Sequence, residues 1–166
     1  MRGARAMWDK TIRLINRTVE NVTAVALMTM VIVVFWQIIS RVIFSSSFPW
    51  TEELSRYLMI WITLLGASIA FQYGAHIGVE VLVMKLNRKL RNAVQIIASL
   101  CCLALFAILI VKGIEIVGKS MVQKSPAMTL PMGYAYLIMP ISGVLMTLNL
   151  LDVTIKSVRA KEAKKE

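Results

Sequence analysis

The sequence predicts an all-α integral membrane protein with four transmembrane helices, and three observations support this fold class. The chain has 166 residues, of which 58% are hydrophobic and 17% are charged, and its mean hydropathy is +0.70. The sequence contains four long apolar runs, and its net charge is +10. An ordinary soluble domain is only about 45–50% apolar, so this chain lacks the polar residues that would cover a soluble core. The composition therefore excludes a soluble globular domain and a disordered chain.

Each apolar run is long enough to cross a hydrocarbon core of about 30 Å at about 1.5 Å per residue. We assign transmembrane helices to 22–44, 54–73, 93–111 (with a helical extension to about residue 124) and 131–151, none with a charged residue at its centre. The first run is too long for a signal peptide, and Ser40-Arg41-Val42 is not a small-residue cleavage site. We therefore expect 22–44 to remain in the mature protein.

Two further segments have the period of amphipathic helices. One covers 1–20 and the other 77–92, and each separates an apolar stripe from a basic one. Such helices lie in the membrane interface, where basic side chains meet anionic headgroups. The residues expected at phospholipid headgroups are Arg13, Arg17, Lys85, Arg88 and Lys89.

The distribution of Lys and Arg predicts the orientation. Five lie in the N-terminal segment, four follow the second span, and five lie in the basic tail 152–166. Only five lie on the other side of a four-span topology: Arg41, Arg56, Lys112, Lys119 and Lys124. The positive-inside rule then places both termini in the cytoplasm. The positive charge is explained by this orientation and is not a sign of nucleic-acid binding.

The start of the second span holds the densest polar cluster. Thr51 is expected to cap the helix, Glu52 and Glu53 to face its positive dipole end, and Arg56 to pair with Glu52 four residues away. Two interpretations remain open: a capped helix start with surface charges, or a polar contact that registers this chain against a partner. The residues assigned to the second interpretation are Arg41, Trp50, Glu52, Glu53 and Arg56.

The second span also has small residues at four-residue spacing, namely Gly66, Ala70 and Gly74. Such a ridge allows two membrane helices to approach closely, either within the chain or with a partner helix. Two prolines mark the last span: Pro131 suits its first turn, and Pro140 is expected to kink it.

Little in the sequence points to catalysis. His76 is the only histidine, which excludes a haem held by two histidines, and no His, Cys, Asp or Glu cluster has metal-ligand spacing. We therefore predict no catalytic, substrate-binding or metal site and no cofactor. All nine acidic residues lie near span ends or in connectors, which disfavours a proton-coupled pump.

The stretch from Trp50 to Tyr57, followed by Gly66-Ala67-Ser68 and by 74–80 (GAHIGVE), resembles the small membrane subunit of tripartite ATP-independent periplasmic (TRAP) transporters, the DctQ type. Arg41, Ser125-Pro126-Ala127, Pro131 and Pro140 also resemble that family, and the likeness spans about Thr18 to Leu151. It implies a multi-pass protein of the bacterial inner membrane with no enzyme activity.

The resemblance also implies partners. One is a large elevator-type membrane subunit that carries the sodium and substrate sites, and the other is a periplasmic binding protein that delivers an organic acid such as a dicarboxylate or sialic acid. This chain would be the non-catalytic scaffold that anchors the large subunit. The alternative is a self-sufficient four-helix transporter acting as a homodimer.

Overall fold

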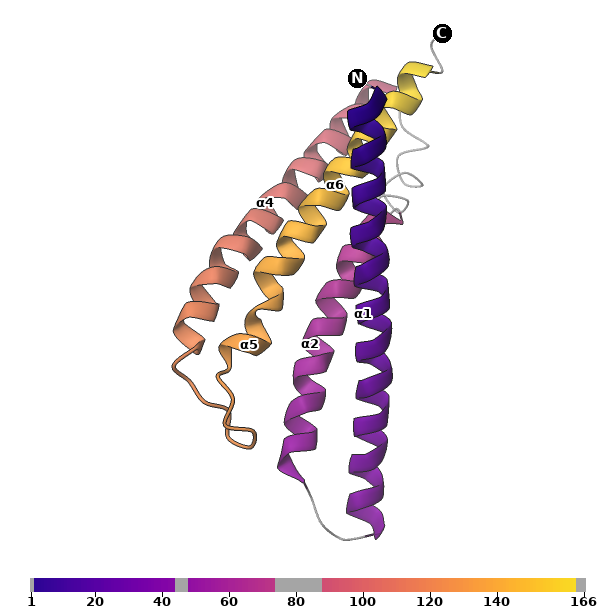
Figure 1. Ribbon diagram of the computed structural model, residues 1–166. Coiled ribbons are helices and arrows are strands. Elements are labelled where there is room, and N and C mark those ends of the chain that lie inside the picture. Colours follow the sequence, from indigo (N-terminus) through magenta and orange to yellow (C-terminus); the bar gives the residue numbers. More distant parts are fainter. Residues whose placement is uncertain (1, 44–47, 74–87, 164–166) are drawn as a thin grey trace.

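The structure is a computed structural model that describes residues 2–43, 48–73 and 88–163 (Figure 1). Its elements are α1 (Arg2–Ile43), α2 (Pro49–Gln72), α4 (Arg88–Ser120), α5 (Gly133–Tyr136) and α6 (Ile138–Ala163). Four segments are long and apolar enough to cross a membrane: Met7–Ile43, Pro49–Gln72, Ala93–Ser120 and Gly133–Lys156. The predicted fold class, an all-α membrane protein with four spans, is confirmed.

The first helix is longer than the sequence predicted. The segments 1–20 and 22–44 were expected to be separate helices, but residues 2–43 form one uninterrupted helix of 42 residues. No proline or glycine follows Gly3 within it, so nothing breaks the backbone hydrogen bonds between the two segments. At about 1.5 Å per residue α1 is roughly 63 Å long, so its first turns extend beyond a hydrocarbon core of about 30 Å.

The segment predicted as an interfacial helix over 77–92 falls largely outside the described residues. Gly74, His76 and Lys85 are among those outside, whereas residues 88–92 form the beginning of α4. The tail 152–166 continues α6 as helix to Ala163.

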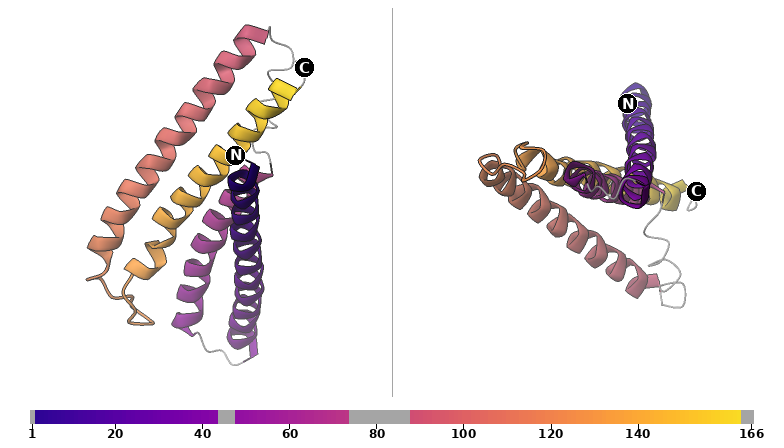
Figure 2. Two further views of the ribbon diagram at one scale, coloured as in Figure 1. Left: turned by 45° about the horizontal axis from the view of Figure 1, so that its top comes forward. Right: turned by 90° about the horizontal axis from the view of Figure 1, so that it is seen from below.

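The helices form a layer in the order α4, α6, α2, α1. Helix α6 packs against both α2 and α4, and α1 packs mainly against α2 (Figures 1 and 2). In the apolar stretch of the span Gly133–Lys156, which includes most of α6, 39% of the residues are buried inside the structure. The corresponding share is 0–11% in the spans formed by α1, α2 and α4. Helix α6 is therefore the centre of the layer, and α1 and α4 are its two edges.

The apolar core is small and lies where α2, α4 and α6 meet. It is built on Phe106, Met146 and Leu150, with Ala67 and Phe71 packed against them. The rings of Phe71 and Phe106 meet edge to face with centroids 5.0 Å apart. This aromatic pair joins α2 to α4 across the face of α6.

Glycines allow α4 and α6 to approach closely. A Cβ added at Gly113 would lie 2.9 Å from Pro140 Cδ, and one added at Gly143 would lie 2.7 Å from Ile110 Cγ1. On α2 the situation is different, because a Cβ at Gly66 would meet nothing within 4 Å. The close packing between helices therefore uses glycines on α4 and α6, and the α2 ridge faces open space at Gly66.

The expected kink at Pro140 takes the form of an interruption one turn earlier. Helix α5 ends at Tyr136, and α6 begins at Ile138. Pro140 has no N–H to donate to the Tyr136 carbonyl, and its ring crowds that carbonyl, so one continuous helix is disfavoured there. Pro131 precedes Met132, the N-cap of α5, and so lies just outside the first turn that the sequence predicted.

Gly113→Ala should lower the free energy of unfolding by about 1–3 kcal/mol, because the new methyl group meets the rigid Pro140 ring. Gly118→Ala on the same helix is the matched control, since a Cβ there meets nothing within 4 Å. Thermal unfolding in detergent, followed by circular dichroism, measures both. Equal melting temperatures for the two variants would contradict the proposed packing.

Candidate functional site

The first turn of α2 is set by Phe48 and Pro49. Phe48 is the N-cap residue in extended conformation, and Pro49 begins the helix, a position in which its missing N–H has no consequence. The Thr51 hydroxyl donates to the Phe48 carbonyl at 2.7 Å, and Thr51 is fully buried. The prediction that Thr51 caps the helix is therefore wrong, because the helix starts two residues before it.

Glu52 and Arg56 form the predicted ion pair on the outer side of this turn. Arg56 Nη2 lies 2.5 Å from Glu52 Oε1, with 71% and 49% of the two side chains exposed. Exposed pairs at this spacing contribute only about 0.3–0.5 kcal/mol to stability in water. The pair therefore contributes little to the stability of the helix, and both charges remain accessible at the surface.

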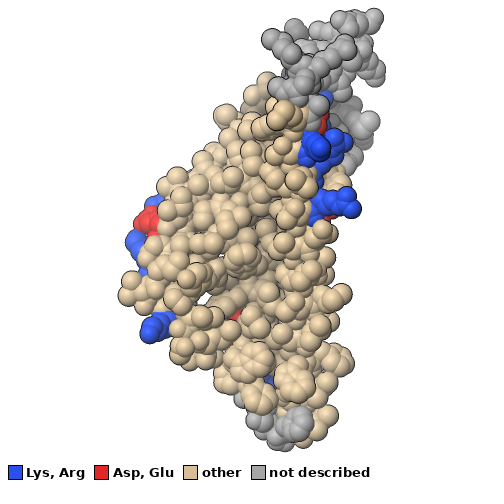
Figure 3. All heavy atoms as spheres, in the orientation of Figure 1, with Lys and Arg blue, Asp and Glu red and all other residues tan. Residues whose placement is uncertain are grey.

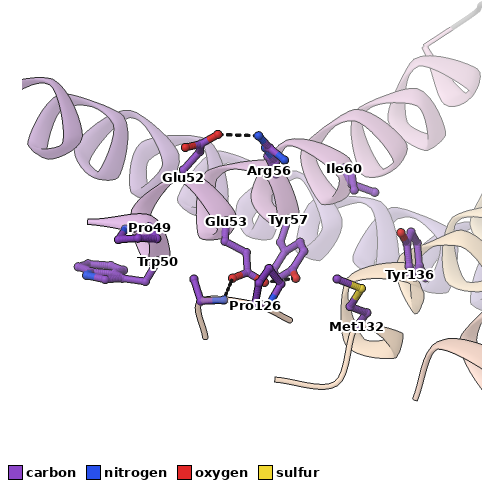
Figure 4. A pocket seen from close by; sticks show the side chains of 11 residues that line it. Pro49, Trp50, Glu52, Glu53, Arg56, Tyr57, Ile60, Pro126, Met132 and Tyr136 are labelled. Atoms are coloured by element: carbon purple, nitrogen blue, oxygen red, sulfur yellow. Dashed lines mark hydrogen bonds and ion pairs between the residues drawn. The ribbon is translucent and has the colours of Figure 1, made fainter. Parts of the chain in front are cut away.

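Glu53 points to the other side and holds a distant loop. Its Oε2 accepts hydrogen bonds from the backbone N–H groups of Ala127 at 3.0 Å and Met128 at 3.1 Å. Its Oε1 accepts the Tyr57 hydroxyl. One carboxylate thus fastens the loop after α4 to the start of α2 (Figure 4). We call this set of contacts the Glu53 clasp.

The loop is shaped to present those two N–H groups. It folds as a hairpin over residues 121–132, closed by hydrogen bonds from Ser125 N to Leu130 O at 2.8 Å and from Met132 N to Gln123 O at 2.8 Å. Thr129 has a φ of 55°, in the left-handed region that a β-branched residue rarely adopts. Hydrogen bonds within the hairpin use the N–H groups of Ser125, Thr129 and Met132, whereas those of Ala127 and Met128 donate to Glu53.

A cleft of about 720 Å³ lies between the first turns of α2 and the hairpin with α5. It is visible as a hollow between α2 and the start of α6 (Figure 3), and its lining side chains are drawn in Figure 4. The lining is mainly proline, aromatic and aliphatic, with the three charged side chains at its α2 wall: Pro49, Trp50, Glu52, Glu53, Arg56, Tyr57, Ile60, Pro126, Ala127, Met132 and Tyr136. Binding sites of this volume are typically lined by apolar side chains with a few polar groups, so the cleft is a candidate binding surface.

A second polar centre lies deep between α1, α2 and α6. Asn16 Nδ2 donates to Asn149 Oδ1 at 2.9 Å, and Asn149 Nδ2 donates to Asn16 Oδ1 at 3.1 Å and to the Ser68 carbonyl at 2.8 Å. Only 5% of Asn16 and 2% of Asn149 are exposed. We call this set the amide junction. The sequence did not predict the amide junction, since neither Asn16 nor Asn149 is charged and the two lie 133 positions apart.

Two contacts lie near the amide junction. Asp152, one turn further along α6, is buried and pairs with Lys156 at 2.5 Å. Tyr73, which follows α2, donates its hydroxyl to Glu20 at 2.5 Å. This hydrogen bond to a carboxylate raises the pKa of Tyr73, since it stabilises the protonated phenol.

The structure separates the residues that the sequence grouped together. Trp50, Glu52, Glu53 and Arg56 line one cleft, whereas Arg41 is exposed at the end of α1 and is not part of its lining. Ala70 is exposed on α2, and Arg13 and Arg17 are exposed on α1. Among the residues that the structure describes, no three His, Cys, Asp or Glu side chains are close enough to hold a metal ion.

Glu53→Ala should free the hairpin while leaving α2 folded. Hydrogen bonds to a charged group contribute roughly 1.5–3 kcal/mol each, so protection of the Ala127 and Met128 amides should fall by about tenfold to a hundredfold. Hydrogen–deuterium exchange of the peptide covering the hairpin measures this. Glu52→Ala is the control and should leave that exchange unchanged; similar acceleration in both variants would argue against the Glu53 clasp.

Asn149→Leu should cost more stability than the double variant Asn16→Leu/Asn149→Leu. The single change leaves the Asn16 amide buried without its partner, whereas the double change replaces both amides with apolar groups of similar shape. Hydrogen bonds within membrane proteins contribute up to about 1.7 kcal/mol, which sets the size of the expected difference. Equilibrium unfolding in mixed micelles measures the free energy of unfolding of the unchanged chain, of each single variant and of the double variant. Additive losses would show that the two amides do not act as a unit.

Comparisons with known proteins agree with this fold. Residues 30–160 match the family described as tripartite ATP-independent periplasmic transporters, DctQ component. The chain is 33% identical over 149 residues to a Haemophilus influenzae protein described as a TRAP transporter small permease protein, covering 87% of this chain and 89% of that one. It is 25% identical over 144 residues to the sialic acid TRAP transporter small permease protein SiaQ of Vibrio cholerae, covering 86% and 83%.

A third relative is much longer. The isethionate TRAP transporter permease protein DctMQ of Oleidesulfovibrio alaskensis is 32% identical over 105 residues, which cover 62% of this chain but only 16% of that protein. The family match and the four apolar helices identify a multi-pass protein of the bacterial inner membrane. The chain belongs to the DctQ family, the small membrane subunits of TRAP transporters.

Proposed function

We propose that this chain is the non-catalytic scaffold subunit of a sodium-coupled TRAP transporter for an organic acid. It pairs with a large elevator-type membrane subunit and anchors that subunit in the bilayer. The relatives named for sialic acid, C4-dicarboxylate and isethionate support an organic acid as the transported class. Sodium coupling and the substrate site are assigned to the large subunit, and a periplasmic binding protein delivers the substrate.

The observation that carries the pairing is the longer relative. A segment similar to this chain is part of one polypeptide whose remaining 84% lies outside the match. A second relative, the SiaT permease of Haemophilus influenzae, likewise matches over only 11% of its length. Fusion in one chain supports a stoichiometric partnership between a small segment and a large one. A small subunit that pairs with a large one needs a surface that binds it.

Two features of the structure supply candidates for that surface. The cleft presents Trp50 and the Glu52–Arg56 pair at the end of the layer remote from both chain termini (Figures 1 and 4). Gly66 and Ala70 leave α2 accessible, and Arg41 is exposed at the end of α1. With both termini in the cytoplasm, the cleft would lie at the periplasmic end, where the binding protein docks.

Gly66→Leu should weaken assembly with the large subunit by about tenfold, because the added side chain occupies space that a partner helix would use. Gly118→Leu is the matched control, since Gly118 also has open space around it but lies on α4. Affinity purification of the large subunit, followed by quantification of the co-purified small chain, measures assembly. Equal yields for both variants would argue against an α2 interface.

Transport by the purified chain is a direct test of the scaffold role. Liposomes with this chain alone should accumulate no organic acid, whereas those with both subunits, binding protein and a sodium gradient should. Uptake by the chain alone would favour the alternative of a self-sufficient homodimer. Altered substrate selectivity in an Arg56→Gln variant with intact assembly would also contradict a scaffold role.

A further inference from the structure

The free edge of α4 carries a group of charges that the proposed function does not use. Lys112 Nζ lies 2.8 Å from Glu115 Oε2, and Lys119 Nζ lies 2.7 Å from Glu115 Oε1. The two lysine side chains are 65% and 74% exposed. One carboxylate thus binds two ammonium groups, and the triad carries a net charge of +1. Each ammonium retains donors for a further acceptor.

The triad faces away from the rest of the layer. Ile108, Lys112, Glu115 and Lys119 follow one another at spacings of three and four residues, which places them on one face of α4. Gly113 and Ser120 are buried on the face toward α6. Helix α4 packs only against α5 and α6, so its outer face has no neighbour among the described helices (Figure 2).

Exposed apolar side chains surround the charges. Ile108 and Val111 are 59% and 62% exposed where the apolar run ends, and Val122, past the last turn, is 87% exposed. The apolar run Ala93–Val111 spans about 28 Å, which places Lys112 at the edge of the hydrocarbon core and Lys119 about 10 Å further out. Figure 3 shows charged side chains of both signs gathered at this edge, with uncharged residues around them.

We infer that this edge, which we call the α4 anchor, binds the phosphate groups of anionic phospholipids in the leaflet remote from the chain termini. The lysines bind the phosphates, and the exposed Ile108 and Val111 lie beside the upper acyl chains. A lipid is favoured over an acidic protein because the same helix face continues without a break into apolar residues at hydrocarbon depth. Glu115 fixes the two ammonium groups along the helix edge and limits their repulsion. The inference rests on the membrane span of α4 and not on the transporter role.

Lipid retention provides the first measurement. The full chain is purified in detergent from vesicles of phosphatidylcholine with phosphatidylglycerol, and the retained phosphatidylglycerol is counted per chain. Lys112→Gln/Lys119→Gln should lower retention by about tenfold, and the charge-preserving variant Lys112→Arg/Lys119→Arg should keep it. Equal retention in the two variants would overturn the α4 anchor.

The second measurement reports how deep this edge of α4 lies in the membrane. An Ile116→Cys variant, labelled on α4 between the two lysines, carries an environment-sensitive fluorophore in the same vesicles in a Cys101→Ser/Cys102→Ser background. Its fluorescence should be quenched by a lipid that is spin-labelled near the headgroup and shielded from aqueous iodide. Strong quenching by iodide would overturn the inference. Shielding that appears only when the large subunit is added would replace the lipid with a protein partner.

Discussion

The structure depends on one buried amide. Asn149 lies on α6, the central helix of the layer, and bonds at once to Asn16 on α1 and to the backbone of α2 at Ser68. In a bilayer the apolar faces of helices gain little by meeting one another, since lipid is equally apolar, so polar contacts and close packing determine which faces meet. The amide junction fixes the rotation of three helices about their axes. The glycines at the α4–α6 contact then attach the fourth helix.

The two ends of the layer consequently differ. Near the termini, the amide junction holds α1, α2 and α6 together; at the other end, α2 separates from α5 and α6 and leaves the cleft (Figures 1 and 3). The Glu53 clasp keeps that open end in one shape, because it binds the hairpin to the start of α2. The cleft beside it stays open. A preformed surface loses less conformational entropy when a partner binds. This division between a tightly bonded end and an open, shaped end is consistent with the proposed scaffold role.

The four spans and the Glu52–Arg56 pair could be predicted from the sequence because each depends on residues close together in the chain. The Glu53 clasp and the amide junction could not, since they join residues 74 and 133 positions apart. Glu53 was expected to serve the helix dipole, and its role emerges only when the hairpin folds back onto α2. Four-residue spacing identified the α2 ridge but not its partner, and Gly66 proves to face outward. Thr51 was misassigned because Pro49 starts the helix earlier than the polar pattern suggested.

The proposed scaffold role requires this layer to be one fixed unit within the two-subunit transporter. Spin labels at Met28 on α1 and Leu105 on α4, both exposed, report the distance between its two edges. The distance distribution is measured by pulsed electron spin resonance in the reconstituted complex, without and with sodium and substrate, in the background that lacks Cys101 and Cys102. A fixed layer gives one narrow distance distribution that sodium and substrate do not change. A shift of about 5 Å, one helical turn, or a second population on adding substrate would show that the small subunit itself moves during transport.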